Sequence, residues 1–146
     1  MPDANNPRQL VVFTLGTEHY ALAIQQVHEI IRYSEPRSVA SRADWVRGVI
    51  SLRGRIVPVY DLAARLGVPS QLTEDTKIVI VEAGSETAGV IVDGVEEVLT
   101  VEDEQLQDAP GADTTLIDSI AKIDDRLVVL LKAGAIFSEP DLAVAA

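Results

Sequence analysis

The second half of this chain of 146 residues repeats its first half, in two ungapped blocks. Residues 10–31, LVVFTLGTEHYALAIQQVHEII, align with residues 78–99, IVIVEAGSETAGVIVDGVEEVL, and residues 45–66 align with residues 116–137. The identical pairs include Gly16/Gly84, Glu18/Glu86, Val27/Val95, Glu29/Glu97, Arg55/Arg126 and Val57/Val128. A unit that recurs at this spacing predicts one small domain built from two copies of one folding unit.

The length of the chain favours a single domain, because either half alone would bury too little apolar surface to be stable. We expect this domain over residues 9–138, with disordered tails at residues 1–8 and 139–146. No apolar run approaches the roughly 20 residues of a membrane helix, and the N-terminus lacks a signal-peptide pattern. The chain has no cysteine, so nothing points to an oxidising compartment. We therefore expect a cytoplasmic protein without direct membrane insertion.

The net charge of −11 is unevenly distributed. Residues 1–70 hold eight arginines and six acidic residues, whereas residues 71–146 hold four basic and seventeen acidic residues. A chain this acidic repels a phosphate backbone, so we expect no nucleic-acid partner. The asymmetry could steer charged protein partners, or it could simply keep the second half soluble.

Short apolar runs bounded by turn residues predict an all-β fold. In the first copy, Gly16-Thr17 and Arg53-Gly54 each join two apolar arms into a hairpin, and residues 25–32 read as a helical turn leading into a short strand. The second copy predicts strands near 76–83, 87–93, 95–100, 117–123 and 126–131. Five strands per copy indicate two small barrels, the first mostly residues 10–66 and the second mostly residues 76–137.

Three local predictions concern the first copy. Residues 62–67 predict a short helix, with Asp61 as its N-cap and Gly67 as the glycine that ends it. Asp44 is expected to cap a helical turn at 45–47. Pro58 lies inside a hairpin arm, which indicates that this arm is an edge strand or is opposed by a bulge.

The sequence offers little for catalysis. His19 and His28 lack metal-ligand spacing, and Asp61 is a better N-cap than general base. No phosphate loop, nucleophile elbow or zinc-protease motif is present. We expect no enzyme activity, no metal and no cofactor.

One pattern is specific to the first copy. Its hairpin residues are replaced in the second copy, with the pairs being Gly48/Ser119, Arg53/Asp124, Gly54/Asp125 and Pro58/Val129. A guanidinium beside exposed backbone and aliphatic side chains suits a protein-docking surface, because arginine pairs bidentately with carboxylates. The alternative is an ordinary turn with a solvated arginine.

The run VRGVISLRGRIVPVYDL, at residues 46–62, resembles the (V/I)-x-G-V-x-N-L-R-G-x-(V/I)-(V/I)-P-(V/I)-x-D-L signature of CheW-like coupling proteins of bacterial chemotaxis. The resemblance extends over residues 10–137. It implies two five-stranded SH3-like barrels around a common core. It also implies a non-catalytic adaptor that couples the cytoplasmic hairpin tip of chemoreceptors (methyl-accepting proteins) to the regulatory domain of the CheA histidine kinase, recruited to membrane-associated receptor arrays.

The resemblance also implies which residues bind partners. Carried onto matching positions, the partner-binding residues are Val27, Glu29, Gly48, Arg53, Gly89 and Val98. Gly54 is added to them from the hairpin pattern that is specific to the first copy. Glu29 has a counterpart in Glu97, so a structural role is an alternative for it, while Arg53 has no such counterpart.

Some positions depart from the family pattern. Ser51 replaces the usual asparagine, and Ser119 replaces a usual glycine. These departures keep open a paralogue that serves another receptor–kinase pathway, such as twitching motility. The sequence is also compatible with a homologue of the kinase regulatory domain and, in a different class of protein, with a β-barrel sensor of small ligands.

Overall fold

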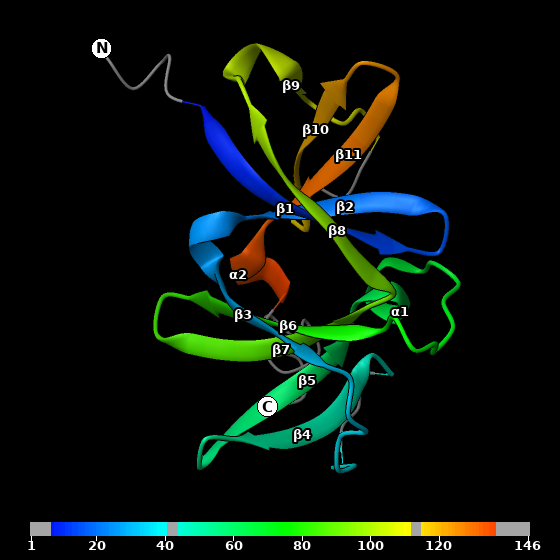
Figure 1. Ribbon diagram of the computed structural model, residues 1–146, viewed down its shortest axis with the longest axis vertical. Coiled ribbons are helices and arrows are strands. Elements are labelled where there is room, and N and C mark those ends of the chain that lie inside the picture. The colour runs from blue at the N-terminus through cyan, green and yellow to red at the C-terminus, as the bar shows by residue number, and fades with distance from the viewer. Residues whose placement is uncertain (1–6, 41–43, 112–114, 137–146) are drawn as a thin grey trace.

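The computed structural model describes residues 7–40, 44–111 and 115–136 as two twisted sheets with short helices between them (Figure 1). The six-stranded sheet, here called sheet A, consists of β8 (Gly94–Val101), β1 (Arg8–Leu15), β2 (Glu18–Ala23), β11 (Arg126–Leu131), β10 (Ile117–Ile123) and β9 (Leu106–Gln107), in that order. The five-stranded sheet B consists of β3 (Val27–Arg32), β6 (Lys77–Ala83), β7 (Glu86–Val92), β5 (Arg55–Asp61) and β4 (Val46–Leu52). The helices are η2 (Ile24–Gln26), α1 (Leu62–Leu66), η3 (Asp103–Gln105) and α2 (Ala133–Ile136).

The internal repeat is confirmed by the order of the strands. Replacing each strand of β8-β1-β2-β11-β10 by its counterpart in the other copy gives β3-β6-β7-β5-β4, which is the order of sheet B. The irregularities match as well, because β3 and β8 are each bulged against their neighbour, as are β4 and β10. Two copies of one unit therefore form an all-β fold of two barrels related by a pseudo-two-fold axis, and α1 and α2 lie on opposite sides of the junction (Figure 1).

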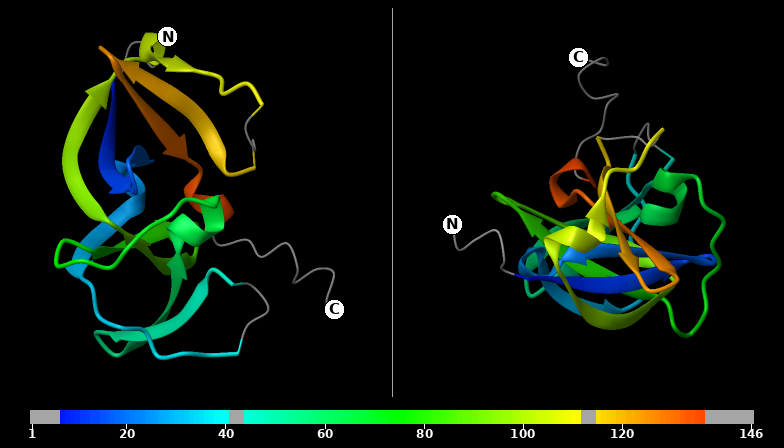
Figure 2. Two further views of the ribbon diagram at one scale, coloured as in Figure 1. Left: turned by 90° about the vertical axis from the view of Figure 1, so that its right-hand side faces the viewer. Right: turned by 90° about the horizontal axis from the view of Figure 1, so that it is seen from above.

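The predicted division into a first barrel of residues 10–66 and a second of residues 76–137 is wrong. Sheet A combines the first hairpin, β1–β2, with β8 to β11, whereas sheet B is continuous from β3 to β7. The chain crosses between sheets through η2, and each parallel pairing, β2 with β11 and β5 with β7, joins strands of different copies. A sequence repeat identifies equivalent segments of chain, but not which segments pack together. It therefore did not reveal that the two copies exchange their first hairpins, with β1–β2 lying in sheet A and β6–β7 in sheet B. Figure 2 shows the two sheets as separate lobes joined at their middle.

The predicted hairpins and the turn-then-strand at residues 25–32 are confirmed, while the ends of the predicted domain differ slightly. Strand β1 begins at Arg8, within the predicted tail. The remaining tail residues, 1–6 and 139–146, lie outside the described residues. The helical turn predicted at residues 45–47 is wrong, because β4 begins at Val46.

The arm that carries Pro58 is opposed by a bulge, as one of the two predicted alternatives requires, because the register of β4 against β5 shifts between Val46 and Gly48. Pro58 does not lie in an edge strand. It occupies β5, between β4 and β7, and pairs in regular register with Val49. The backbone groups of Val49 bond instead to Arg37 on the other side, at 2.8 and 2.9 Å, so the two residues form a non-hydrogen-bonded pair. The pairing of β5 with β7 begins only at Val59. The missing N–H of proline therefore falls where the ladder needs no bond.

The predicted caps of α1 are confirmed. The Asp61 carboxylate accepts a hydrogen bond of 3.1 Å from the backbone N–H of Ala64, and Arg47 donates to the same carboxylate at 2.6 Å. Gly67 has φ +73° and its N–H bonds to carbonyls of the last turn. Asp61 therefore serves as a cap and ion-pair partner, not as a free base.

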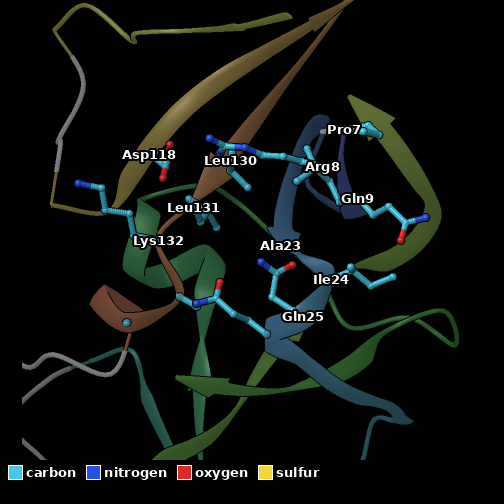
Figure 3. A pocket seen from close by; sticks show the side chains of 14 residues that line it. Pro7, Arg8, Gln9, Ala23, Ile24, Gln25, Asp118, Leu130, Leu131 and Lys132 are labelled. Carbon is cyan, nitrogen blue, oxygen red and sulfur yellow. The ribbon is translucent and has the colours of Figure 1, made fainter. Parts of the chain in front are cut away.

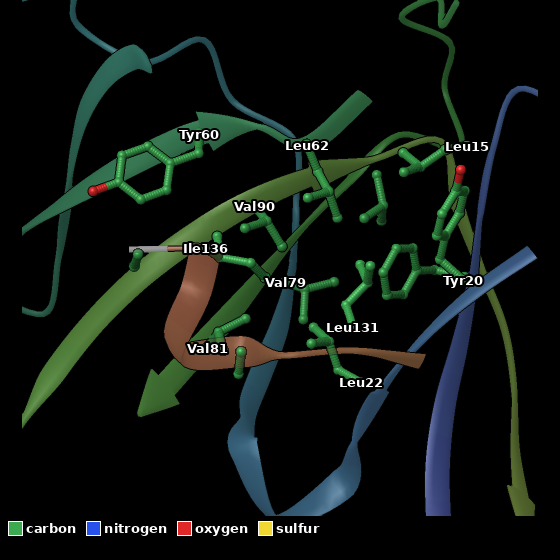
Figure 4. Close-up of a cluster of buried hydrophobic side chains, with 14 of the residues drawn as sticks. Leu15, Tyr20, Leu22, Tyr60, Leu62, Val79, Val81, Val90, Leu131 and Ile136 are labelled. Atoms are coloured by element: carbon green, nitrogen blue, oxygen red, sulfur yellow. The ribbon is translucent and has the colours of Figure 1, made fainter. Parts of the chain in front are cut away.

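Three hydrophobic clusters hold the fold together. The largest lies between the sheets. It consists of side chains from both sheets and from the helices α1 and α2, including Leu15, Leu62, Val79, Val90, Leu131 and Ile136 (Figure 4). A smaller cluster fills each barrel: Leu10, Val12, Ala21 and Leu130 in sheet A, and Val59, Ile78, Ile80 and Ile91 in sheet B. Side chains therefore fill the interiors of both barrels.

Candidate partner-binding site

Glu29 and Arg53 form a bidentate ion pair on sheet B. Arg53 Nη2 donates to Glu29 Oε1 at 2.8 Å, and Arg53 Nη1 donates to Glu29 Oε2. Glu29 lies in β3 and Arg53 in the turn between β4 and β5, so the pair joins the two edges of the sheet and closes the barrel. We call this pair the Glu29–Arg53 fork. Its side chains are exposed by 21% and 68%, respectively.

The turn itself positions the arginine. Arg53 and Gly54 have φ values of +51° and +80°, the consecutive left-handed conformations of a type I′ hairpin turn. Left-handed backbone is unusual for arginine. The left-handed conformation recurs at Asp124, with φ +55°, but not at Asp125, the counterpart of Gly54. The two copies therefore share the conformation of the first turn residue and differ at the second. The prediction that Arg53 lies at a hairpin tip is confirmed, but its guanidinium is engaged by Glu29 and is not simply solvated.

The fork sets the charge state of both partners. Hydrogen bonds from Arg53, helped by its charge and by the nearby His28, hold the pKa of the Glu29 carboxyl below its ordinary value. The same hydrogen bonds and the charge of Glu29 raise the pKa of Arg53. Both groups are therefore charged at neutral pH.

Gly48 has a conformational and steric reason to be glycine. It lies in β4 with φ +140°, and a Cβ there would be 2.0 Å from the carbonyl oxygen of Arg37. That close approach arises because Arg37 pairs with Val49 and covers the outer edge of β4. Gly48 therefore allows the backbone of Arg37 to lie close against β4.

Gly89 is buried inside the barrel of sheet B. It pairs with Ile80 in β6 and with Val59 in β5, and a Cβ would be 2.7 Å from Ile78 Cγ2. This residue faces aliphatic side chains and not the surface. Its position supports a packing role.

The remaining predicted residues lie apart from one another. Val27 is half-buried in β3 against the central cluster, and Gly54 stands in open space in the hairpin turn. Val98 lies in β8 of the other sheet, with 51% of its surface exposed. The structure thus brings Glu29 of β3 and the Arg53-Gly54 turn together where the two edges of sheet B meet, and leaves Val98 on sheet A.

Comparison with known proteins identifies the architecture. The family model of the CheW-like domain matches residues 9–141. A probable chemotaxis protein CheW of Rhizobium etli is 33% identical, over 92% of this chain and 90% of its own. The crystal structure of the scaffolding protein TtCheW from Thermoanaerobacter tengcongensis superposes with a TM-score of 0.86 and 34% identity, covering 92% and 90% of the two chains.

The chain belongs to the CheW-like family. Its role is that of a chemotaxis coupling adaptor. Protein PilI of Pseudomonas aeruginosa is 31% identical, but the match covers only 57% of this chain and 47% of PilI. A role in a paralogous pathway therefore has less support than a role in chemotaxis.

A further ion pair lies on sheet A, at the place equivalent to the Glu29–Arg53 fork, and the sequence analysis did not predict it. Arg126 Nη1 donates to Glu97 Oε2 at 2.8 Å on sheet A. Glu97 is the counterpart of Glu29, but the cation comes from the counterpart of Arg55 and not of Arg53. The identities Glu29/Glu97 and Arg55/Arg126 in the repeat were the signal that could have revealed it.

Exposed aliphatic residues accompany both ion pairs. Ile30 in β3 and Val98 in β8 are equivalent in the two copies, with 40% and 51% exposed, and so are Ile56 in β5 and Leu127 in β11, with 75% and 57% exposed. Ile30, Ile56 and Leu127 were not among the predicted residues. Large aliphatic side chains on a polar rim are typical of protein interfaces.

One open groove lies beside the junction of the sheets. It has a volume of about 570 Å³, and Arg8, Gln9, Gln25 and Lys132 are among the side chains around it (Figure 3). Its lining is mixed in charge, because it includes Asp118 as well as Arg8 and Lys132. A β-barrel sensor of small ligands would need an apolar cavity with converging polar groups, which this groove does not provide.

Proposed function

We propose that this chain couples the cytoplasmic hairpin tip of a methyl-accepting chemoreceptor to the regulatory domain of a CheA-type histidine kinase, by binding alone. The observation that carries the proposal is the Glu29–Arg53 fork, a charged pair exposed at a barrel edge. Exposed ion pairs contribute little to folding. The fork is thus better suited to recognition than to stability.

The fork leaves hydrogen-bonding capacity for a partner. Glu29 engages one N–H on each terminal nitrogen of Arg53, whereas a guanidinium offers five N–H groups in all. The side chain of Arg53 is 68% exposed. A carboxylate or backbone carbonyl of a partner can therefore bind to the same arginine without breaking the fork.

An apolar anchor lies on the same hairpin. Ile56 is 75% exposed and lines a groove of about 440 Å³ together with Arg37, Val49 and Ile50. An aliphatic side chain beside a cationic tip supplies the two components of a protein interface, an apolar centre and a polar rim. These features support sheet B as one docking surface.

The equivalent features of sheet A support a second docking surface. Val98, Leu127 and the pair Glu97–Arg126 repeat the same combination of exposed aliphatic and charged groups. An adaptor needs at least two surfaces, one for each partner. Modest interfaces then gain strength from multivalency within a receptor array.

The chemistry of the described residues supports binding without catalysis. Asp61 is occupied as a helix cap and by Arg47. Within residues 7–40, 44–111 and 115–136, no three His, Cys, Asp or Glu side chains cluster as metal ligands would. In the same residues, no helix is long and apolar enough to cross a membrane. We propose that recruitment to a membrane-associated array depends on the receptor.

Co-sedimentation with receptor-containing membranes and the kinase tests the proposal. The parent chain should appear in the pellet and increase the amount of kinase found there. R53A should lose capture, while R55A is the matched control, because it removes the same charge from an exposed arginine two residues away. Equal capture by the two variants, or no capture of the parent chain, would contradict the proposal.

A further inference from the structure

His28 occupies the bulge of β3, next to the fork. Val27 pairs with Val81 and Glu29 with Ile80, so His28 is the extra residue on its strand. Bulges re-aim the side chain that they carry. Here the half-exposed imidazole lies between two carboxylates, with Nδ1 3.6 Å from Glu82 Oε2 and Nε2 3.9 Å from Glu29 Oε2.

The oxygen of Glu29 that faces His28 is the one that accepts from Arg53 Nη1. Two groups that can carry positive charge therefore approach the same carboxylate oxygen. A neutral imidazole is uncharged and donates from one nitrogen only, so it competes weakly with a guanidinium, whereas a charged imidazolium donates from both nitrogens. Histidine is the side chain whose charge changes within the physiological pH range.

We propose that His28 is a positioning residue of the Glu29–Arg53 fork, and that its protonation draws Glu29 away from Arg53 and frees the guanidinium for a partner carboxylate. This inference rests on the proposed function. The charged groups that face His28 are Glu29 on its own strand, Glu82 on β6 and, through Glu29, Arg53 on the hairpin turn. Protonation changes the net charge of this cluster from −1 to zero, which also reduces repulsion of an acidic partner.

The second copy shows that this arrangement is not a requirement of the fold. At the equivalent bulge of β8 the residue is Glu96, and it faces His19 of β2 at 3.2 Å. His19 therefore contacts the bulge residue, and the pair Glu97–Arg126 forms without its help. Both histidines of the chain therefore lie beside a glutamate at or next to a strand bulge. Only His28 approaches a carboxylate oxygen that also accepts a hydrogen bond from an arginine.

The test compares capture by receptor-containing membranes at pH about 6 and about 8, for the parent chain, H28Q, H28K and H19Q. Contacts at this exposure predict that the parent chain binds about threefold more tightly at the lower pH. H28Q should lose that ratio, H28K should bind at the higher pH as the parent does at the lower, and H19Q should keep the parent's ratio. Titration of the partner is common to all four proteins, so it does not affect the comparison.

A second measurement needs no partner. The Nε–Hε resonance of Arg53 in the free protein should shift between these pH values in the parent chain and in H19Q, but not in H28Q. A resonance that titrates in this way, without any capture of receptor or kinase, would support the role of His28 and contradict the proposed function. An unchanged resonance, or a parent-like pH ratio in H28Q, would overturn the role of His28.

Discussion

Glu29 and Arg53, 24 residues apart in the chain, connect the two edge strands of one barrel through a bidentate ion pair. The other barrel repeats the acid at the same place as Glu97 but takes its cation from the strand, as Arg126, and not from the turn. The closing contact is therefore common to both barrels, while the exposed arginine at the hairpin tip is specific to sheet B. The closing ion pair is therefore a feature of the fold, whereas the exposed guanidinium of Arg53 is a feature that a partner can bind.

Exchanging the two charges should separate these roles. In E29R/R53D the closing pair can form in reverse, because the equivalent turn position already carries an acid, Asp124, in the same left-handed conformation. We expect Tm within about 3 °C of the parent, since the pair is exposed, but loss of receptor or kinase capture. Thermal melting and co-sedimentation measure the two effects. Capture by the exchanged protein would mean that partners need the closed barrel and not the position of the cation.

The fork also predicts a specific acid sensitivity. Because the pKa of Glu29 is lowered from its ordinary value of 4.5, its stabilising contribution is complete above that value and is lost as the pH falls through the lower pKa of the folded protein. E29Q removes this contribution at every pH. The Tm difference between H28Q and H28Q/E29Q, in which no imidazole competes for Glu29, should therefore be constant at pH values above about 5 and shrink as the pH falls below 4.5. A difference that persists in acid would exclude this role of the carboxylate.

The sequence predicted the elements of the fold better than their partners. Gly16-Thr17 and Arg53-Gly54 were recognisable as turns because their conformations depend on neighbouring residues, and Asp61 as a cap for the same reason. Assignment of strands to barrels depends instead on the parallel pairings between copies. Those pairings leave no local pattern, which is why the hairpin exchange was missed.

The same distinction applies to the candidate site. The family signature marked Arg53 and Glu29 separately, but their contact depends on barrel closure, and the aligned copies pointed to a structural role for Glu29. Gly48 and Gly89 look alike in the sequence as glycines of strands. Only the structure shows that one accommodates Arg37 and the other Ile78. Both glycines are therefore expected to affect binding through stability.

Comparing Gly48 with Gly54 tests whether the close contact with Arg37 makes glycine necessary for stability at position 48. Both have positive φ, but a Cβ at Gly48 would collide with the carbonyl of Arg37, whereas at Gly54 it would meet nothing within 4 Å. We expect G48A to lower the free energy of unfolding by at least about 2 kcal/mol, and G54A by about 1 kcal/mol, from backbone strain alone. Urea unfolding measures both. Similar losses in the two variants would show that the contact with Arg37 adds little.

The last prediction uses one barrel to repair the other. In sheet A the interior pair equivalent to Ile78 and Gly89 is Leu10 and Ala21. Leucine branches one carbon further out than isoleucine, so it can leave room for the alanine methyl group that Ile78 Cγ2, at 2.7 Å, would obstruct in sheet B. G89A should therefore destabilise the protein by about 1–3 kcal/mol through overpacking, and I78L/G89A should recover most of that loss. I78L alone is the control, with an expected cost below about 1.5 kcal/mol. If urea unfolding showed the two changes to be simply additive, the contact with Ile78 would not be the reason for glycine at position 89.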